Sequence, residues 1–128
     1  MPSVSSIATM EEIGPTLLIV DDHDGFRASA RALLEADGFD VVGEASSGLA
    51  GIAAAERLLP DVVLLDVMLP DLDGFAVCEQ ITSERRTQVV LTSSRDASNY
   101  QDALERSRAR GFLAKTDLSG AALNALLK

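Results

Sequence analysis

Residues 62–74 read VVLLDVMLPDLDG, and the organisation of the whole chain can be worked out from this run. Four aliphatic residues lead into Asp66, and Pro70 and Gly74 mark a turn beyond it. A short apolar run that ends in turn residues predicts a strand buried on both faces, with Asp66 at its carboxyl end. Aspartate also favours ordinary turns, so the run alone leaves a structural and a chemical interpretation of Asp66 equally open.

The rest of the chain repeats this pattern of a short apolar strand followed by a helix. Further strands are predicted at residues 17–20, 40–45, 88–92 and 111–114. One helix is expected from Gly25 to a stop at Gly38, with an apolar stripe of Phe26, Ala30, Leu33 and Leu34. The other helices are predicted at 48–58, 74–83, 98–110 and 118–127, the fourth of the five with Tyr100, Ala103 and Leu104 pointing inward.

Regular alternation of strands and helices predicts an α/β fold, a doubly wound parallel sheet of five strands covered by five helices on both faces. If the strand order is 2-1-3-4-5, as in flavodoxin-like folds, ligands bind beyond the carboxyl ends of the strands. Four strands end in polar residues that would converge there: Asp21 and Asp22, Asp66, Ser93 and Lys115.

The chain has 128 residues, 47% of them hydrophobic, which suits one domain with one core. Residues 1–16 show no sustained period and predict a flexible leader, which leaves 17–128 as the folded domain. A formal net charge of −9 at pH 7 argues against nucleic acid or an anionic membrane as partner. No apolar run reaches membrane-spanning length, so we expect a cytoplasmic protein without membrane insertion.

Three carboxylates gathered at one edge would repel each other, so at least one pKa should rise unless a cation is present. Mg²⁺ prefers oxygen ligands and keeps several waters, which suits Asp22 and Asp66 as direct ligands and Asp21 as a ligand through water. A hydroxyl from Ser93 and an ammonium from Lys115 opposite these acids would bind the oxygens of a tetrahedral anion. The set therefore predicts a phosphoryl site.

Together these positions resemble the receiver domain of bacterial two-component response regulators, the CheY-like family, over roughly residues 17–127. The marks are the acid pair after the first strand, Asp66 with Pro70 four and Gly74 eight positions beyond it, and Lys115 22 positions after Ser93. Each mark alone is weak, and jointly they form a specific signature.

The resemblance implies that Asp66 accepts a phosphoryl group from a sensor histidine kinase or a phosphotransfer protein. It implies Mg²⁺, or Mn²⁺ in its place, held by Asp22, Asp66 and the backbone carbonyl of Met68. Lys115 would pair with a phosphoryl oxygen, and Ser93 and Phe112 would form the switch pair. The signal would leave through the face made by the fourth helix, fifth strand and fifth helix, toward an unidentified downstream protein or a phosphorylation-dependent dimer.

Such a receiver is not an enzyme acting on external substrates, because it catalyses only its own phosphoryl transfer and dephosphorylation. Thirteen residues follow Lys115, so no DNA-binding domain is expected in the chain as given, although it fits the receiver part of a longer DNA-binding regulator. An aspartyl-phosphate phosphatase is disfavoured because Met68 stands where that class carries a second aspartate. A flavodoxin-type flavin carrier is disfavoured because its phosphate would meet acids.

Several conspicuous residues are expected to have ordinary roles. We expect His23 to be a solvated loop residue and Cys78 a small core residue without an activated thiolate. Asp71 and Asp73 are predicted turn formers and the N-cap of the third helix. Arg106 and Arg108 are expected to pair along their helix with Asp102 and Glu105, in preference to forming a docking patch with Arg110.

Overall fold

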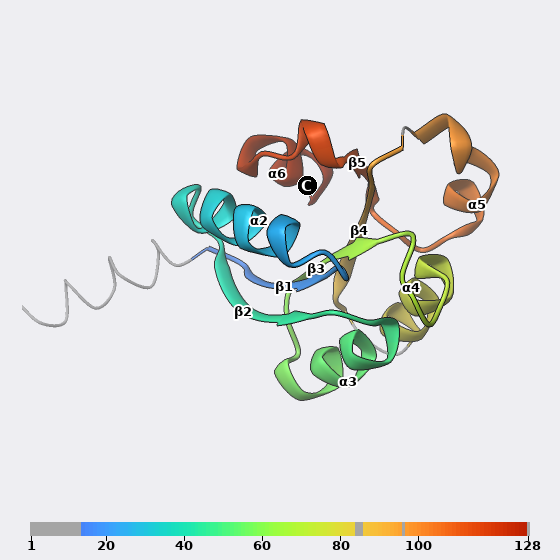
Figure 1. Ribbon diagram of the computed structural model, residues 1–128, viewed down its shortest axis with the longest axis horizontal. Helices are drawn as coiled ribbons and strands as arrows, with labels where there is room; N and C mark the ends of the chain where they lie inside the picture. Colours follow the sequence, from blue (N-terminus) through green and yellow to red (C-terminus); the bar gives the residue numbers. More distant parts are fainter. Residues whose placement is uncertain (1–13, 84–85, 96, 128) are drawn as a thin grey trace, which may run out of the picture.

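The computed structural model describes residues 14–83, 86–95 and 97–127, and five parallel strands form its sheet (Figure 1). The strand order β2-β1-β3-β4-β5 confirms the predicted doubly wound topology. The strands are β1 Thr16–Val20, β2 Asp40–Ala45, β3 Val62–Asp66, β4 Gln88–Ser93 and β5 Gly111–Ala114. Residues 1–13, most of the predicted leader, lie outside the described residues. β1 begins at Thr16, one residue earlier than predicted.

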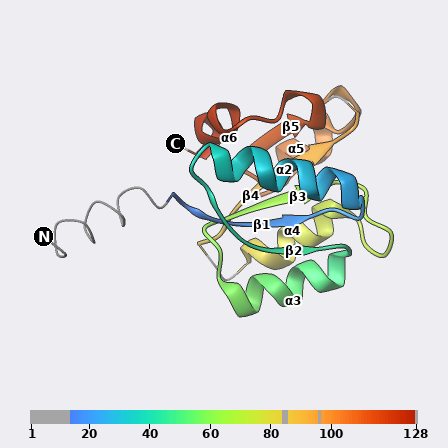
Figure 2. The same cartoon turned by 60° about the vertical axis from the view of Figure 1, so that its left-hand side comes forward.

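Helices cover both faces of the sheet (Figure 2). On one face lie α2 Asp24–Ala36 and α6 Gly120–Leu127, and on the other α3 Gly48–Leu58, α4 Gly74–Thr82 and α5 Gln101–Arg106. Among the described residues no helix combines the length and apolar character that crossing a bilayer requires.

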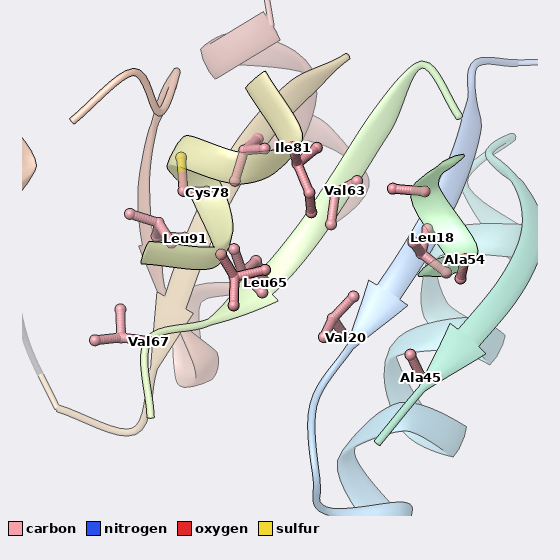
Figure 3. Packing of buried hydrophobic residues seen from close by; sticks show 13 residues of the cluster. Leu18, Val20, Ala45, Ala54, Val63, Leu65, Val67, Cys78, Ile81 and Leu91 are labelled. Carbon is pink, nitrogen blue, oxygen red and sulfur yellow. The ribbon is translucent and has the colours of Figure 1, made fainter. Parts of the chain in front are cut away.

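The central strand β3 is buried along its whole length, as its sequence predicts. Val63 and Leu65 pack into the core beneath α3 and α4, and Val62 and Leu64 pack into the core beneath α2 and α6. Figure 3 shows the first of these cores, where Leu65 lies near Cys78 and Leu91. Because β3 has apolar neighbours on both faces, its position is strongly specified, and so is that of Asp66 at its end.

Helix α2 begins one residue before the predicted Gly25 and α4 ends one residue before the predicted position 83, and two other helices differ more from the predicted bounds. The helix expected at 98–110 is instead a 3₁₀ turn, η1 Ala97–Asn99, followed by the short α5. Tyr100 interrupts it with φ −130° and ψ 10°, and the Ser107 hydroxyl donates to the carbonyl of Leu104 (2.8 Å), which ends α5. The last helix begins two residues later than predicted, after η2 Lys115–Asp117, because the Ser119 hydroxyl accepts the N–H of Ala122 (3.0 Å).

The apolar stripe predicted for α2 is only partly correct. Ala30 and Leu34 are buried, whereas Leu33 is 39% exposed and faces away from the core. Gly38 follows the end of α2 with φ +100°, a left-handed conformation that glycine adopts without strain. The predicted pairing of Glu105 with Arg108 is absent from the ion pairs of residues 86–95 and 97–127. Arg108 Nε lies 3.9 Å from Glu79, and Arg106 donates to the carbonyl of Asp102 (3.4 Å).

The loop after β3 is held by two aspartates with different roles. The Asp73 carboxylate accepts the N–H of Phe75 (2.9 Å) and caps α4, as predicted. Asp71 instead reaches α3, accepting the N–H groups of Gly48 (2.7 Å) and Leu49 (2.9 Å) at that helix's N-terminus. Donation by these N–H groups lowers the pKa of the Asp71 carboxyl. The loop beyond Asp66 is therefore tied to a second helix.

Gly74 is required by close backbone approach and supplies a test of this loop. A Cβ there would lie 2.5 Å from the carbonyl oxygen of Asp66 and 2.6 Å from Cα of Val67. Because both are backbone atoms, Gly74→Ala should lower the free energy of unfolding by about 1–3 kcal/mol. A Cβ added at Gly25 in α2 would meet no neighbouring atom within 4 Å. Gly25→Ala should therefore raise stability by up to about 1 kcal/mol. Chemical denaturation compares the two, and equal effects would contradict the packing around Gly74.

Candidate functional site at the carboxyl edge of the sheet

Acidic residues gather where β1 and β3 end. Asp21 is fully buried and Asp66 is 3% exposed, whereas Asp22 lies at the surface. One ligand atom from each of Asp21, Asp22, His23 and Asp66 lies within 4.8 Å of the others. β1 and β3 are adjacent parallel strands, so their carboxyl ends meet at one edge. The predicted convergence of the acids is thus present in the structure.

The turn that carries the first two acids is held by α2. Arg27 donates from Nη1 to the carbonyl of Asp21 (2.6 Å) and pairs with Asp24 and with Glu44 (3.1 Å). His23 is largely exposed, as expected, but its Nδ1 lies 3.0 Å from Asp21 Oδ1 and 3.1 Å from Asp22 Oδ1. Its ring therefore lies against the acids and is not simply solvated.

Lys115 reaches the two buried acids from the end of β5. Its Nζ lies 2.7 Å from Asp21 Oδ2 and 3.4 Å from Asp66 Oδ2. The ammonium also lies 4.4 Å from the ring centroid of Phe26, at cation–π distance. Lys115 is therefore partly buried and paired with two carboxylates, unlike an ordinary exposed lysine on the surface.

The surroundings of Asp66 raise the pKa of its carboxyl. Burial is the largest cause, and the charge of Asp21 acts in the same direction. The N–H of Met68, which donates to Asp66 Oδ1 (3.1 Å), and the ammonium of Lys115 lower the pKa without compensating fully. The prediction that at least one clustered acid has a raised pKa is confirmed, with burial outweighing repulsion.

Ser93 faces the same space from the end of β4. A cavity of about 290 Å³ is lined by Asp22, Asp66, Met68, Ser93 and Lys115 together with neighbouring loop residues. The Ser93 hydroxyl is buried and accepts the N–H of Arg95 (3.0 Å). The structure thus brings an alcohol, an amine and carboxylates around one opening that is large enough for a phosphoryl group.

Phe112 is not among the residues that line this cavity. Its ring is half-buried and lies 6.0 Å, centroid to centroid, from that of Tyr100. The hydroxyl of Tyr100 is 3.3 Å from that of Ser93. Sequence analysis places Tyr100 inward but does not predict this contact, which depends on the irregular turn before α5. Cys78 is buried, and burial raises the pKa of its thiol to about 11, which confirms that it is not an activated thiolate.

The acidic cluster fits a hard divalent cation. Its donors are mainly carboxylate oxygens, which Mg²⁺ prefers, and a cation beside the buried Asp66 carboxylate would stabilise the ionised form that burial disfavours. Receiver domains bind Mg²⁺ through such a group of aspartates.

The sequence model of the response regulator receiver domain matches residues 17–126. This chain belongs to that family. BvgA from Bordetella pertussis, named as a transcription regulator of virulence factors, is 33% identical over 110 residues, which cover 85% of this chain and 53% of BvgA. The transcriptional regulatory protein LiaR from Bacillus subtilis is 37% identical over 103 residues, covering 78% of this chain and 48% of LiaR. The receiver chain thus spans about half the length of these curated relatives.

A solved receiver domain has the same architecture. The signal receiver domain of NarL from Mycobacterium tuberculosis superimposes with a TM-score of 0.77 at 35% identity, over 90% of this chain and 98% of that one. The receiver domain of CheB from Thermotoga maritima gives 0.77 at 22% identity, which supports the fold alone. Both agree with the CheY-like strand order.

The raised pKa of Asp66 predicts a pH-dependent stability difference. A carboxyl whose folded-state pKa lies above its unfolded value, about 3.9, weakens the folded state once it ionises. Asp66→Asn should therefore be more stable than wild type at about pH 7 without divalent ions, and the gap should narrow as pH falls toward about 4. Urea denaturation across this range measures it, with the exposed Asp40→Asn as control. An Asp66→Asn variant less stable than wild type at neutral pH would contradict the raised pKa of the Asp66 carboxyl.

Proposed function

We propose that this receiver accepts a phosphoryl group on Asp66 from a phosphohistidine of a sensor kinase or phosphotransfer protein, and so acts as a phosphorylation switch. The observation that carries the proposal is the cavity in which Asp66, Ser93 and Lys115 meet. Asp66 ends a rigid buried strand, so its carboxylate is held in place for attack on phosphorus. The new oxygen–phosphorus bond replaces the bond from phosphorus to the donor's imidazole nitrogen.

The other side chains stabilise charge as the phosphoryl group moves. Phosphoryl transfer passes through a loose transition state with charge spread over the equatorial oxygens, so positioned cations and donors supply most of the catalysis. Lys115, 3.4 Å from Asp66 Oδ2, is placed to pair with one of these oxygens. The Ser93 hydroxyl, on the same cavity, is placed to donate to another.

Asp22, Asp66 and the carbonyl of Met68 would hold Mg²⁺ or Mn²⁺, with Asp21 acting through water. When bound, the cation neutralises carboxylate and phosphoryl charge. The Asp21 carboxylate already pairs with Lys115 (2.7 Å), which is consistent with Asp21 contacting the cation through water and not directly. His23 would help to orient Asp21, whose Oδ1 accepts the backbone N–H of His23 (2.8 Å) and lies 3.0 Å from His23 Nδ1.

The phosphorylated receiver would pass its signal to a binding partner. The first candidate is a downstream protein that binds the α5, β5 and α6 face in a phosphorylation-dependent way. A DNA-binding segment is the second candidate, because curated relatives about twice as long are named as transcription regulators. In both, the receiver modifies no external substrate.

Substitution of the acceptor tests the proposal. Asp66→Asn should abolish labelling by a small phosphodonor such as acetyl phosphate, because an amide does not attack phosphorus. Asp40→Asn, at an exposed carboxylate, should label like wild type, and removing divalent cations should stop labelling of both wild type and this control. Phosphate-affinity gel shifts measure the outcome, and label retained in Asp66→Asn would rule out this acceptor.

The proposed role of Lys115 gives a separate prediction. Lys115→Met keeps much of the side-chain length but removes the charge from the cavity. Loss of one preorganised charge donor should slow phosphoryl transfer to Asp66 by roughly 10²-fold or more. Stopped labelling reactions at fixed phosphodonor measure this rate, and circular dichroism checks the fold. An unchanged rate in a folded variant would show that Lys115 only compensates the buried acids.

A further inference from the structure

The Ser93 hydroxyl connects two parts of the molecule. It lines the cavity that contains Asp66 and Lys115, and it lies 3.3 Å from the hydroxyl of Tyr100 on the other side. One acceptor position of Ser93 Oγ is already taken by the N–H of Arg95 (3.0 Å). Because Ser93 Oγ borders the cavity and also lies beside the Tyr100 hydroxyl, a rotation about the Cα–Cβ bond of Ser93 would turn its hydroxyl from one to the other.

The hydrogen bond between the Ser93 and Tyr100 hydroxyls is weak enough to be replaced by a stronger one. Its length of 3.3 Å exceeds the usual O–H···O distance of about 2.7–2.8 Å, so it is a weak hydrogen bond. A phosphoryl oxygen is charged, and charge-assisted hydrogen bonds are roughly twice as strong as neutral ones. Once Asp66 carries a phosphoryl group, the Ser93 hydroxyl forms a stronger hydrogen bond with a phosphoryl oxygen than with the Tyr100 hydroxyl.

Tyr100 is placed to transmit the change to three elements. It stands between η1 and α5, where its N–H donates to the carbonyl of Ala97 (2.9 Å) and its carbonyl accepts the N–H of Leu104 (2.8 Å). Its ring lies between those of Phe75 in α4 and Phe112 in β5, at centroid distances of 6.1 and 6.0 Å. A shift of this one ring therefore alters the packing of α4, α5 and β5 together.

The same ring forms part of a surface groove. Tyr100 lines a depression of about 630 Å³ together with Met68, Pro70, Phe75, Arg95 and Ala103. This groove runs between the loop after β3 and the start of α5. Tyr100 therefore links the groove to Ser93, because its ring lines the groove and its hydroxyl lies beside the Ser93 hydroxyl.

Phe112 cannot replace Tyr100 in this role. The Phe112 ring has no hydrogen-bonding group, so it cannot sense the orientation of the Ser93 hydroxyl directly. It contacts the ring of Tyr100 and would follow that ring's movement.

We propose that Tyr100 is the positioning residue that senses phosphorylation: its hydroxyl is bound to Ser93 in the resting state and released when Ser93 turns to the phosphoryl group. The proposal rests on the proposed phosphorylation of Asp66. After release, the half-buried Tyr100 hydroxyl has lost its protein partner, and the ring moves toward water to recover one. The groove and the α5 surface change as a consequence.

The composition of the chain makes this testable without a label. Tyr100 is the one tyrosine, and there is no tryptophan, so intrinsic fluorescence comes from this side chain. Acrylamide quenching of the emission should increase when acetyl phosphate and Mg²⁺ are added to wild type. Intact mass measured on the same samples reports the phosphoryl group.

Two serine variants separate the contact from the phosphorylation. Ser93→Ala should show the higher quenching before any phosphodonor is added and little further change afterwards. Ser83→Ala, at an exposed hydroxyl at the end of α4, should respond like wild type. No gain in mass in wild type would contradict the proposed function. Phosphorylated wild type with unchanged quenching would overturn the role of Tyr100 while leaving the proposed function intact.

Tyr100→Phe tests the hydroxyl itself, since it keeps the ring between Phe75 and Phe112. It should still become phosphorylated, but the backbone amide shifts of residues 101–106 in ¹H–¹⁵N spectra of the resting variant should already lie toward the phosphorylated wild-type positions. A resting spectrum like that of resting wild type, followed by a full response to phosphorylation, would show that the hydroxyl carries no signal.

Discussion

Two carboxylates, Asp21 and Asp66, are buried at the ends of neighbouring strands, and the ammonium of Lys115 is shared between them. Two unit charges about 4 Å apart near a protein surface interact by roughly 4 kcal/mol, so this arrangement would be costly without the lysine. Lys115 lies nearer Asp21 than Asp66, and the pKa of Asp66 stays raised. Burial and the charge of Asp21 thus oppose ionisation of the residue proposed to react, and a bound cation would favour it.

The rest of the fold keeps these groups in place. β3 is buried on both faces, so Asp66 cannot move away from Asp21 without disturbing two cores. Arg27 holds the turn that carries Asp21 and Asp22, and Asp71 ties the loop after Asp66 to α3. The part of the chain proposed to change is different in kind: η1 and α5 are short, and none of their residues is buried. The buried strands hold the site residues in place, whereas the loosely packed α5 can change its position when Asp66 is phosphorylated.

The fold and the gathering of the acids could be predicted because they follow from local pattern and topology. Apolar runs specified the strands, and parallel strands must bring Asp66, Ser93 and Lys115 to one edge. The predictions that were wrong concern features set by local capping and tertiary contacts. Helix α5 ends earlier than predicted because Ser107 caps it, and Arg108 lies near Glu79 and not Glu105. The contact of Tyr100 with Ser93 could not be predicted, because a break in the helix sets the direction of that ring.

The central claim is that Asp66 is the residue that receives phosphate. Reducing the phosphorylated protein with borohydride converts an aspartyl phosphate to homoserine, and peptide mass spectrometry then locates the modified position. The account predicts homoserine at position 66 and at no other aspartate of the cluster. Homoserine at position 21 or 22, or phosphate that withstands reduction on a serine or threonine, would contradict it.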